Sequence, residues 1–286
     1  MEIGIATPAG PHTPPDFLAE VGRIAESRGF HSLWVPEHVL FFQEHVSRYP
    51  YSEDGRVPGN PTGAIEPFLA LGWLAAHTER IRLGTGICLV PQRAPIYTAK
   101  QVADLDFLSG GRVDFGVGIG WLREEFEALG VPWERRAART RECVAVMKTL
   151  WCDEVSSFQG EFYSLPRCLQ NPKPIQDPHP PIHFGGESDA ALRRAAEIGQ
   201  GWYGFQLEPD GARERIRRLG EILAESGREP SALHISVAAP SRRVSKQDAQ
   251  RYADAGVDQV ILPIAAGRIE RFATAADEAA ALIGAC

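Results

Sequence analysis

Short apolar stretches alternate with longer amphipathic segments along the whole chain. The apolar stretches have the length of β-strands, and the segments between them carry apolar residues three and four positions apart, which is the spacing of one helix face. Strands are therefore predicted at 2–8, 32–37, 81–90, 112–120, 181–186, 201–206, 233–240 and 259–265. A predicted helix follows each strand, so the chain contains eight strand–helix units.

Capping residues indicate where several of these helices begin and end. Thr13 stands directly before a proline and predicts the start of the first helix. Gly110 and Gly111 predict the end of the third helix, because glycine readily adopts the left-handed conformation of a helix stop. Ser188 predicts the N-cap of a helix that continues to about residue 198.

Eight strand–helix units in 286 residues predict a (β/α)8 TIM barrel, organised as a single domain over 1–286. The chain has a long loop after the second strand, at 38–65, and an insertion after the fourth helix, at 151–180. A doubly wound open sheet is disfavoured, because such sheets usually have fewer strands and no glycine-rich dinucleotide motif follows the first strand.

A barrel of this kind carries its active site at the carboxyl ends of the strands. The candidate positions follow directly from the predicted strand ends: Thr7, Glu37, His38, Gly86, Gly118 to Trp121, Gly185, Gly186, Gln206, Pro240 and Pro263. A histidine at this rim titrates near neutral pH and can exchange a proton with a bound substrate. His38 is the candidate catalytic residue, with a solvated or structurally bonded loop histidine as the alternative.

Three of the strand ends are rich in glycine: GTG at 84–86, GVGIG at 116–120 and FGG at 184–186. The dinucleotide fingerprint does not fit GVGIG, because its third glycine is replaced by Trp121 in one register and by Arg123 in the other. Glycines at such turns either relieve crowding or admit a ligand close to the backbone. Three neighbouring cases favour a flat ligand against the rim.

The stretch FGGESDAALRRAA indicates an anion site. Its glycines lead into the N-cap Ser188, and the first turn of the following helix offers unpaired N–H groups beside a positive dipole end. This arrangement suits a phosphate, and an ordinary capped helix is the alternative.

Composition limits the partners of the chain. The net charge is −7 and no block of five basic residues occurs, which argues against nucleic acid and an anionic membrane surface. The absence of a signal-peptide pattern and of a run of about 18 apolar residues predicts a cytoplasmic protein that acts on a small molecule. The five cysteines show no C-x-x-C spacing, and prolines separate His179 from His183, so no metal site is predicted.

Four stretches in order carry a resemblance to a known family: WVPEH at 34–38, IRLGTGICLVPQRAPIYTAKQVADLDFLSGGR at 81–112, GVGIGWLREEFEALGVPWERR at 116–136 and PIHFGGESDAALRRAAEIGQGW at 181–202. Together they resemble the bacterial-luciferase-like family, and within it the branch of oxidoreductases that depend on the deazaflavin coenzyme F-420. The resemblance extends over residues 1–206 and is weaker over the last 80 residues.

This resemblance implies a cofactor at the strand ends, either F-420, which is an 8-hydroxy-5-deazaflavin, or FMN. It implies a non-proline cis peptide between Gly86 and Ile87 that supports the ring, and it gives His38 the role of proton donor or acceptor. The implied cofactor-binding residues are Glu37, Thr85, Gly86, Ile87, Gly118, Gly120, Gly185, Gly186, Glu187 and Ser188.

The function expected from residues and resemblance is hydride transfer between F-420 and an organic substrate that the sequence does not identify. Alternatives are an FMN-dependent monooxygenase, a non-catalytic flavin-binding protein and a metal-dependent barrel hydrolase. F-420 is favoured over FMN because Ile119 stands where some FMN-dependent members have an arginine for the phosphate. Arg93, Arg123 and Lys173 are candidate partners for the carboxylates of the F-420 side chain.

The loop at 38–65 and the insertion are expected to roof the site through their aromatic residues. The family also implies a homodimer through the second and third helices. The expected interface residues are Leu69, Leu71, Trp73, Ala99, Val102, Ala103 and Phe107.

Overall fold

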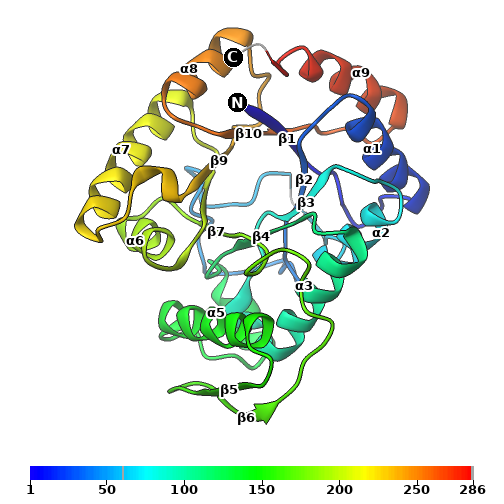
Figure 1. The fold of residues 1–286 in the computed structure, drawn as a ribbon. Helices are drawn as coiled ribbons and strands as arrows, with labels where there is room; N and C mark the ends of the chain where they lie inside the picture. The colour runs from blue at the N-terminus through cyan, green and yellow to red at the C-terminus, as the bar shows by residue number, and fades with distance from the viewer. Residues whose placement is uncertain (60, 285–286) are drawn as a thin grey trace.

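Eight parallel strands close into a barrel in the computed structural model, which describes residues 1–59 and 61–284 (Figure 1). The order around the barrel is β1-β10-β9-β8-β7-β4-β3-β2. The strands are β1 (Glu2–Ala6), β2 (Ser32–Val35), β3 (Arg82–Thr85), β4 (Val113–Val117), β7 (Ile182–Gly185), β8 (Gly201–Phe205), β9 (His234–Ala238) and β10 (Gln259–Pro263). Pairing of β1 with β10, from Glu2 opposite Gln259 onward, closes the ring and confirms the predicted (β/α)8 fold.

Helices surround this barrel and bury the outer faces of its strands (Figure 1). They are α1 (Pro15–Ser27), α2 (Pro67–Ala75), α3 (Pro95–Ser109), α4 (Arg123–Ala128), α5 (Arg136–Cys152), α6 (Asp189–Ile198), α7 (Pro209–Glu225), α8 (Lys246–Asp254) and α9 (Ile269–Ala280). Inside the barrel a second cluster contains Trp34, Tyr203, Ala238 and Ile261. Burial on both faces explains why these strands are nearly continuous apolar runs.

The capping predictions are confirmed at two helices and wrong at one. Gly110 has φ of 73° at the end of α3, and Ser188 caps α6 by accepting a hydrogen bond from the Ala191 N–H at 3.3 Å. Thr13 does not cap α1, which begins at Pro15 with Pro14 at the N-cap position. The Thr13 hydroxyl donates instead to the Pro8 carbonyl at 3.1 Å and stabilises the preceding loop.

Several strands are shorter in the structure than the sequence predicts. β3 ends at Thr85, after which the chain passes through the predicted cis peptide between Gly86 and Ile87 and a short 3-10 helix, η1 (Val90–Gln92). β4 ends at Val117, so only the first two residues of GVGIG belong to the strand. The residues expected to complete these strands form loops above the barrel instead.

The segment between β4 and β7 contains more structure than the sequence indicates. The six-residue helix α4 was not predicted, because a single turn and a half is too short for a hydrophobic period to appear. After α5, strands β5 (Ser156–Gln159) and β6 (Ser164–Cys168) pair antiparallel in a sheet of their own. This two-stranded sheet lies beside α5 and away from the barrel mouth (Figure 1).

A buried ion pair supports the amino-terminal end of the barrel, opposite the loops described above. Asp114 accepts two hydrogen bonds from Arg82, at 2.8 Å from Nε and 2.6 Å from Nη2. Burial raises the pKa of Asp114, but His183 and Arg82 more than offset this effect and hold the pKa well below its usual value. The charge is therefore compensated inside the structure and serves stability.

Two predictions about the whole chain remain as predictions: the single domain over 1–286 and the cytoplasmic location. None of the helices in the described ranges has the length and apolar character needed to cross a bilayer. Cys143 lies in the core, as its place on an apolar helix face predicts, whereas Cys286 lies outside the described residues.

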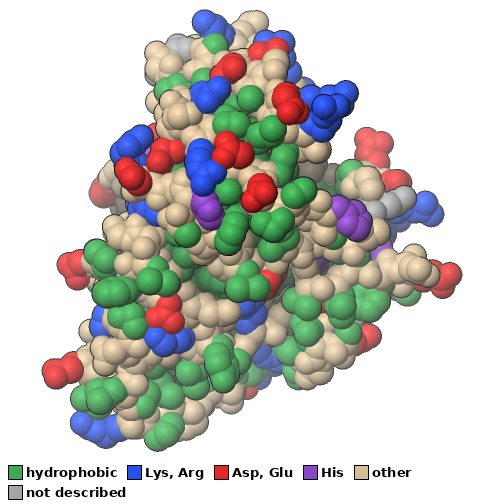
Figure 2. Space-filling view, turned by 90° about the vertical axis from the view of Figure 1, so that its right-hand side faces the viewer, with side chains coloured by type: hydrophobic (Ala, Val, Ile, Leu, Met, Phe, Trp, Pro, Cys, Tyr) green, Lys and Arg blue, Asp and Glu red, His purple; other side chains and the backbone are tan. Residues whose placement is uncertain are grey.

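The expected dimer surface is only partly available. Leu71, Ala99, Val102 and Ala103 are fully buried against the barrel of their own chain, so their proposed place in an interface is wrong. Other apolar side chains of α2 and α3 do reach the surface, where hydrophobic side chains gather on the face that carries these helices (Figure 2). The exposed set is Leu69, Trp73, Ile96, Tyr97, Phe107 and Leu108.

We expect this exposed apolar surface of α2 and α3 to form a two-fold interface, because such patches on isolated chains usually mark contact sites. The wild-type protein should have a dimeric mass at micromolar concentration, measured by light scattering. Replacing Leu69 and Phe107 together by Lys should give a monomer, since these side chains are 72% and 52% exposed. The control Leu129→Lys lies outside the patch and should remain dimeric; a monomeric wild type would contradict the prediction.

Candidate active site

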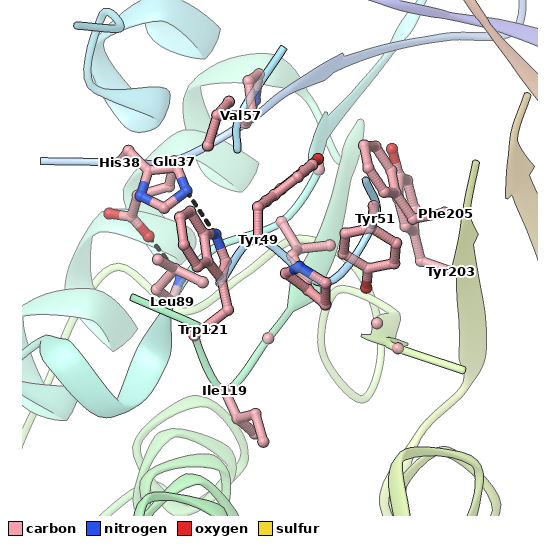
Figure 3. Close-up of a pocket in the computed structure, with 18 of the residues that line it drawn as sticks. Glu37, His38, Tyr49, Tyr51, Val57, Leu89, Ile119, Trp121, Tyr203 and Phe205 are labelled. Carbon is pink, nitrogen blue, oxygen red and sulfur yellow. Dashed lines mark hydrogen bonds between the residues drawn. The ribbon is translucent and has the colours of Figure 1, made fainter. Parts of the chain in front are cut away.

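A cavity of about 790 Å³ opens above the carboxyl ends of the barrel strands (Figure 3). Its floor and walls come from residues at or after the ends of β1, β2, β3, β4, β7 and β8, and the loop at 38–65 covers it. Four of the candidate strand-end residues, Thr7, Gln206, Pro240 and Pro263, do not line it. The cavity therefore leaves out the ends of β9 and β10.

Most of the residues predicted from the sequence meet in this cavity. Its lining includes Glu37, His38, Gly86, Ile87, Gly118, Gly120, Gly185, Gly186, Glu187 and Ser188. Thr85 is the exception, because it is buried and its hydroxyl donates to the Gly116 carbonyl at 2.7 Å. Thr85 thus links β3 to β4 and does not face the cavity.

The glycines of the rim are required by the protein itself. A Cβ atom at Gly118 would lie 2.3 Å from Ile87 Cδ1, and one at Gly185 would lie 2.4 Å from the same atom. A Cβ atom at Gly116 would lie only 1.9 Å from the Thr85 carbonyl oxygen. The crowding interpretation of GVGIG is therefore correct, since Ile87 extends over β4 and β7 and fills the space that the glycines leave.

His38 is held on the cavity wall by two side chains. Its Nδ1 atom lies 3.2 Å from Glu125 Oε2. Its Nε2 atom lies 3.2 Å from the Trp121 indole Nε1, a contact drawn as a dashed line in Figure 3. The indole is only a donor and a carboxylate is only an acceptor. The neutral imidazole therefore carries its proton on Nδ1 and presents Nε2 as an acceptor.

Glu125 is the buried carboxylate on which this arrangement depends. It accepts hydrogen bonds from the backbone N–H groups of Val39 and Leu40, at 2.7 and 3.1 Å, and from the side chain of Gln92 at 3.0 Å. Burial raises its pKa, but hydrogen bonds, with that of His38 first, lower the pKa below the usual value. Glu125 is thus a carboxylate at neutral pH and fixes the orientation of His38.

Sequence reasoning missed Glu125 because it stands in a run of charged residues, REEFE, on a helix that was not predicted. The neighbouring Glu124 also binds the loop, accepting from the backbone N–H groups of Val46 and Ser47 at 2.6 and 3.0 Å. The pair of acidic residues at the start of α4 therefore anchors the loop at 38–65 in two places. Only the tertiary structure distinguishes their roles.

Glu37 lines the cavity, but its carboxylate is already bound. It accepts a hydrogen bond from the Leu89 N–H at 2.5 Å and forms an ion pair with Arg93. Arg93 also binds Glu66 at 2.9 Å, and its guanidinium lies over the Phe68 ring. Glu37 therefore holds the loop after β3 in place.

Aromatic side chains cover the cavity. Tyr49 packs edge-on against Trp121 with 5.2 Å between ring centroids, and Tyr51 packs against Phe205 at 4.8 Å (Figure 3). The loop at 38–65 contributes to this cover as predicted, whereas the insertion does not line the cavity. Trp151, expected there, is buried and donates to the Ala99 carbonyl at 2.9 Å.

Two arginines that the sequence did not indicate also line the cavity: Arg136 at the start of α5 and Arg194 on α6. The three basic residues that were considered lie elsewhere. Arg93 binds Glu37 and Glu66, Arg123 binds Glu127 and Glu134, and Lys173 donates to the carbonyls of Leu150 and Asp153. The sequence does not single out Arg194: it stands six residues after the N-cap Ser188, which is not a same-face spacing in a helix, and Arg193 stands beside it.

No three His, Cys, Asp or Glu side chains converge as a metal site within the described residues. The two histidines weighed in the sequence lie apart from the cavity lining. His179 is hydrogen-bonded to the Pro180 carbonyl at 2.8 Å, and His183 Nε2 lies 3.6 Å from Asp114 at the opposite end of the barrel.

Fold and cavity together define a (β/α)8 barrel with an aromatic small-molecule site and one carboxylate-bound histidine on its wall. The chain belongs to the luciferase-like monooxygenase family, whose model matches residues 1–282. Similar proteins in this group include F-420-dependent oxidoreductases and FMN-dependent monooxygenases.

Individual comparisons agree with this assignment. An uncharacterized protein of Mycobacterium tuberculosis is 33% identical over 269 residues, which cover 93% of this chain and 90% of that protein. The FMNH2-dependent dimethylsulfone monooxygenase of Pseudomonas putida is 38% identical over 133 residues, 46% of this chain and 36% of that enzyme. An F-420-dependent secondary alcohol dehydrogenase, solved with an F-420–acetone adduct, has a TM-score of 0.79 at 19% identity and covers 99% and 98% of the two chains.

The contacts of Gly116 and Gly118 predict losses of stability of different size at these two positions. Gly116→Ala should lower the free energy of unfolding by about 3 kcal/mol or prevent folding, because its Cβ meets a backbone oxygen that cannot rotate away. Gly118→Ala should cost about 1 kcal/mol, because the Ile87 side chain can move. Urea denaturation measures both changes.

The double variant Gly118→Ala with Ile87→Val is the control, because valine lacks the Cδ1 atom that the new methyl group meets. It should be no less stable than Ile87→Val alone. Equal losses for Gly116→Ala and Gly118→Ala, or no relief in the double variant, would contradict this account of the rim.

Proposed function

We propose that this protein is an oxidoreductase that binds coenzyme F-420 and transfers a hydride between the coenzyme and a small organic substrate. The observation that carries the proposal is His38 on the cavity wall, with Glu125 and Trp121 fixing both ring nitrogens. Hydride transfer to or from an alcohol or carbonyl group is accompanied by a proton. Nε2 of His38 is the candidate atom to exchange it, once the substrate takes the place of the Trp121 N–H that occupies its lone pair in this structure.

The residues present fit such a coenzyme. The cavity is large enough for a tricyclic ring, and its wall at Gly118 and Gly185 carries no side chain beyond that of Ile87. Elsewhere in the cavity lining, the start of α6 and the two arginines Arg136 and Arg194 provide positive charge for the phosphorylated tail of the coenzyme. We propose that Gly86, Ile87, Gly118 and Gly120 contact the ring and that Gly185 to Ser188 contact the side chain.

When bound, the deazaflavin supplies the hydride at its C5 atom. The protein supplies orientation, exclusion of water and a proton. The loop at 38–65 covers the cavity with Tyr49 and Tyr51, so that largely apolar side chains surround the space beside His38. Glu125 keeps the Nδ1 proton of His38 in place and offsets the positive charge that appears when Nε2 accepts a proton.

An FMN-dependent monooxygenase is the second candidate, and one observation favours it. Ile119 lines the cavity and carries no charge, but Arg136 and Arg194 also line it and provide two cations that the argument from Ile119 does not include. A pair of guanidinium groups suits the doubly charged phosphate of FMN. The pair also suits F-420, whose phosphodiester and carboxylates carry their charges on separate groups.

The two remaining alternatives have less support. A non-catalytic flavin-binding protein needs no titratable group beside the cavity. The hydrogen bonds on both nitrogens of His38 fit the structurally bonded histidine as well, so the His38→Ala experiment below separates the two functions. A metal-dependent hydrolase requires several ligand side chains on one side of the mouth. Such a group is not found among residues 1–59 and 61–284.

Binding tests the choice of coenzyme. We expect F-420 to remain with the protein through gel filtration and to bind at least tenfold more tightly than FMN, about 1.4 kcal/mol. The reason is that arginines on two separate helices can contact two separate anionic groups, whereas FMN carries both charges on one phosphate. Calorimetric titration with both coenzymes measures the ratio. A preference for FMN would overturn the proposal in favour of the monooxygenase.

Removal of the proton-exchanging group tests the mechanism. His38→Ala should lower kcat by about 100-fold, which is the usual contribution of a general acid or base, and should change F-420 affinity only a few-fold. The assay uses a substrate found by screening small alcohols and carbonyl compounds for F-420 reduction or oxidation. His12→Ala, an exposed histidine in the loop after β1, is the matched control. An unchanged rate in His38→Ala would remove this residue from the mechanism.

A further inference from the structure

The loop at 38–65 turns its charged side chains away from the cavity. Its Asp, Glu and Arg residues are all exposed, and none of them lines the cavity: Glu44, Arg48, Glu53, Asp54 and Arg56. Apart from His38, the residues that the loop does place over the cavity are aromatic, aliphatic, proline or glycine. The loop therefore presents an apolar inner surface and a charged outer surface.

Aromatic rings form a continuous band along the covered side of the cavity. The rings that follow one another in this band all line the cavity, and they are Phe41, His38, Trp121, Tyr49, Tyr51 and Phe205. Each lies between 4.8 and 5.7 Å from the next, measured between ring centroids. Figure 3 shows the part of the band from His38 to Phe205. A molecule that reaches Nε2 of His38 must therefore lie against aromatic rings.

Two carboxylates line the cavity among the described residues, and each is already bound. Glu37 forms its ion pair with Arg93. Glu187 accepts the Phe205 N–H at 2.8 Å, and burial raises its pKa, which favours the uncharged acid. Neither group is free to compensate a positive charge on a substrate.

The cations of the lining are likewise not available to a substrate beside the band. Arg136 and Arg194 are the groups that the proposed function gives to the phosphorylated tail of the coenzyme. A positive charge on His38 is compensated by the Glu125 carboxylate, 3.2 Å away. A charged substrate would thus lose its hydration without gaining a counter-charge, which is strongly unfavourable.

We propose that the substrate is an uncharged, apolar alcohol or carbonyl compound that packs against this aromatic band. The hydroxyl or carbonyl group rests on the proposed function, because it is the group that reacts at His38. The preference for an uncharged, apolar body follows from the lining alone. Val57, a half-buried aliphatic residue of the loop that lines the cavity, is the expected specificity-determining residue for charge.

Compounds of matched shape test the charge class. They are benzyl alcohol, its para-carboxylate, the methyl ester of that acid and the para-aminomethyl derivative, titrated at pH 7 and followed by tryptophan fluorescence. We expect benzyl alcohol and the ester to bind with a Kd of about 1 mM or lower. The carboxylate and the ammonium compound should bind at least tenfold more weakly, because their charges have no partner.

The ester is the control for size, since it is larger than the acid and uncharged. Binding of either charged compound as tight as that of the ester would overturn the proposal. Failure of both uncharged compounds to bind at about 1 mM would overturn it as well.

A charge introduced from the loop should change the preference. We expect Val57→Arg to bind the carboxylate at least tenfold more tightly than the wild type does, and the ester no more tightly. Val46→Arg is the matched control, because Val46 belongs to the same loop, is 93% exposed and does not line the cavity. Equal gains in both variants, or no gain in a folded Val57→Arg protein, would contradict the role of Val57. The wild-type series tests the charge class even if Val57→Arg does not fold.

Titrations with and without coenzyme separate this proposal from the proposed function. If neither F-420 nor FMN binds but the protein alone still prefers the uncharged compounds, the proposed function fails and the apolar site stands. If F-420 binds and is reduced by the charged alcohols at least as well as by the ester, the proposed function stands and the uncharged substrate class is overturned.

Discussion

The packing of Ile87 across β4 and β7 determines the shape of the cavity. Its Cδ1 atom occupies the space that side chains at Gly118 and Gly185 would need. Only glycine at these two positions lets the ends of β4 and β7 pack directly against the isoleucine side chain. The wall that results is apolar, flat and made of backbone and one isoleucine. The loop after β3 is fixed from the other side by Glu37, which binds the Leu89 N–H and Arg93. Rim glycines, Ile87 and Glu37 therefore act as one unit.

The second determinant is the pair of carboxylates at the start of α4. Glu125 binds the backbone just after His38 and the imidazole itself, so the same residue fixes the loop and the reactive side chain. The position of His38 is consequently set by α4, which follows β4, and not by its own loop alone. This coupling places a titratable group precisely at the edge of an otherwise apolar space.

The sequence predicts the barrel well, because a buried strand and an amphipathic helix each impose a period that is local in the chain. The rim histidine and glycines follow from that fold, since parallel strands bring their carboxyl ends together. Contacts between segments that are distant in the chain leave no such local pattern in the sequence. Glu125 and Arg194 each stand beside a residue of the same charge, at Glu124 and Arg193, and the sequence does not show which member of each pair turns inward.

The same limit explains the errors. Thr85 was assigned to the cavity because it precedes Gly86, but alternation of side chains along a strand turns its hydroxyl to Gly116. Leu71, Ala99, Val102 and Ala103 were assigned to an interface, although they form the face that each helix needs for its own barrel. The small residues of α3 allow close packing, but against the strands of the same chain.

The attachment of the covering loop has a consequence for the evolution of substrate range. Its first part is tied to Glu124 and Glu125, up to Ser47, and its end is tied by the Ile65 N–H to the Ala9 carbonyl at 3.1 Å. Between these two attachments lie Tyr49, Tyr51 and Val57, which face the cavity but do not hold His38. Substitutions at Tyr51 and Val57 alter the shape presented to a substrate without touching the residues that hold His38. Tyr49 is different, because it packs against Trp121, which is hydrogen-bonded to His38. The covering loop thus joins substrate recognition to the chemistry at one residue and keeps them apart at the others.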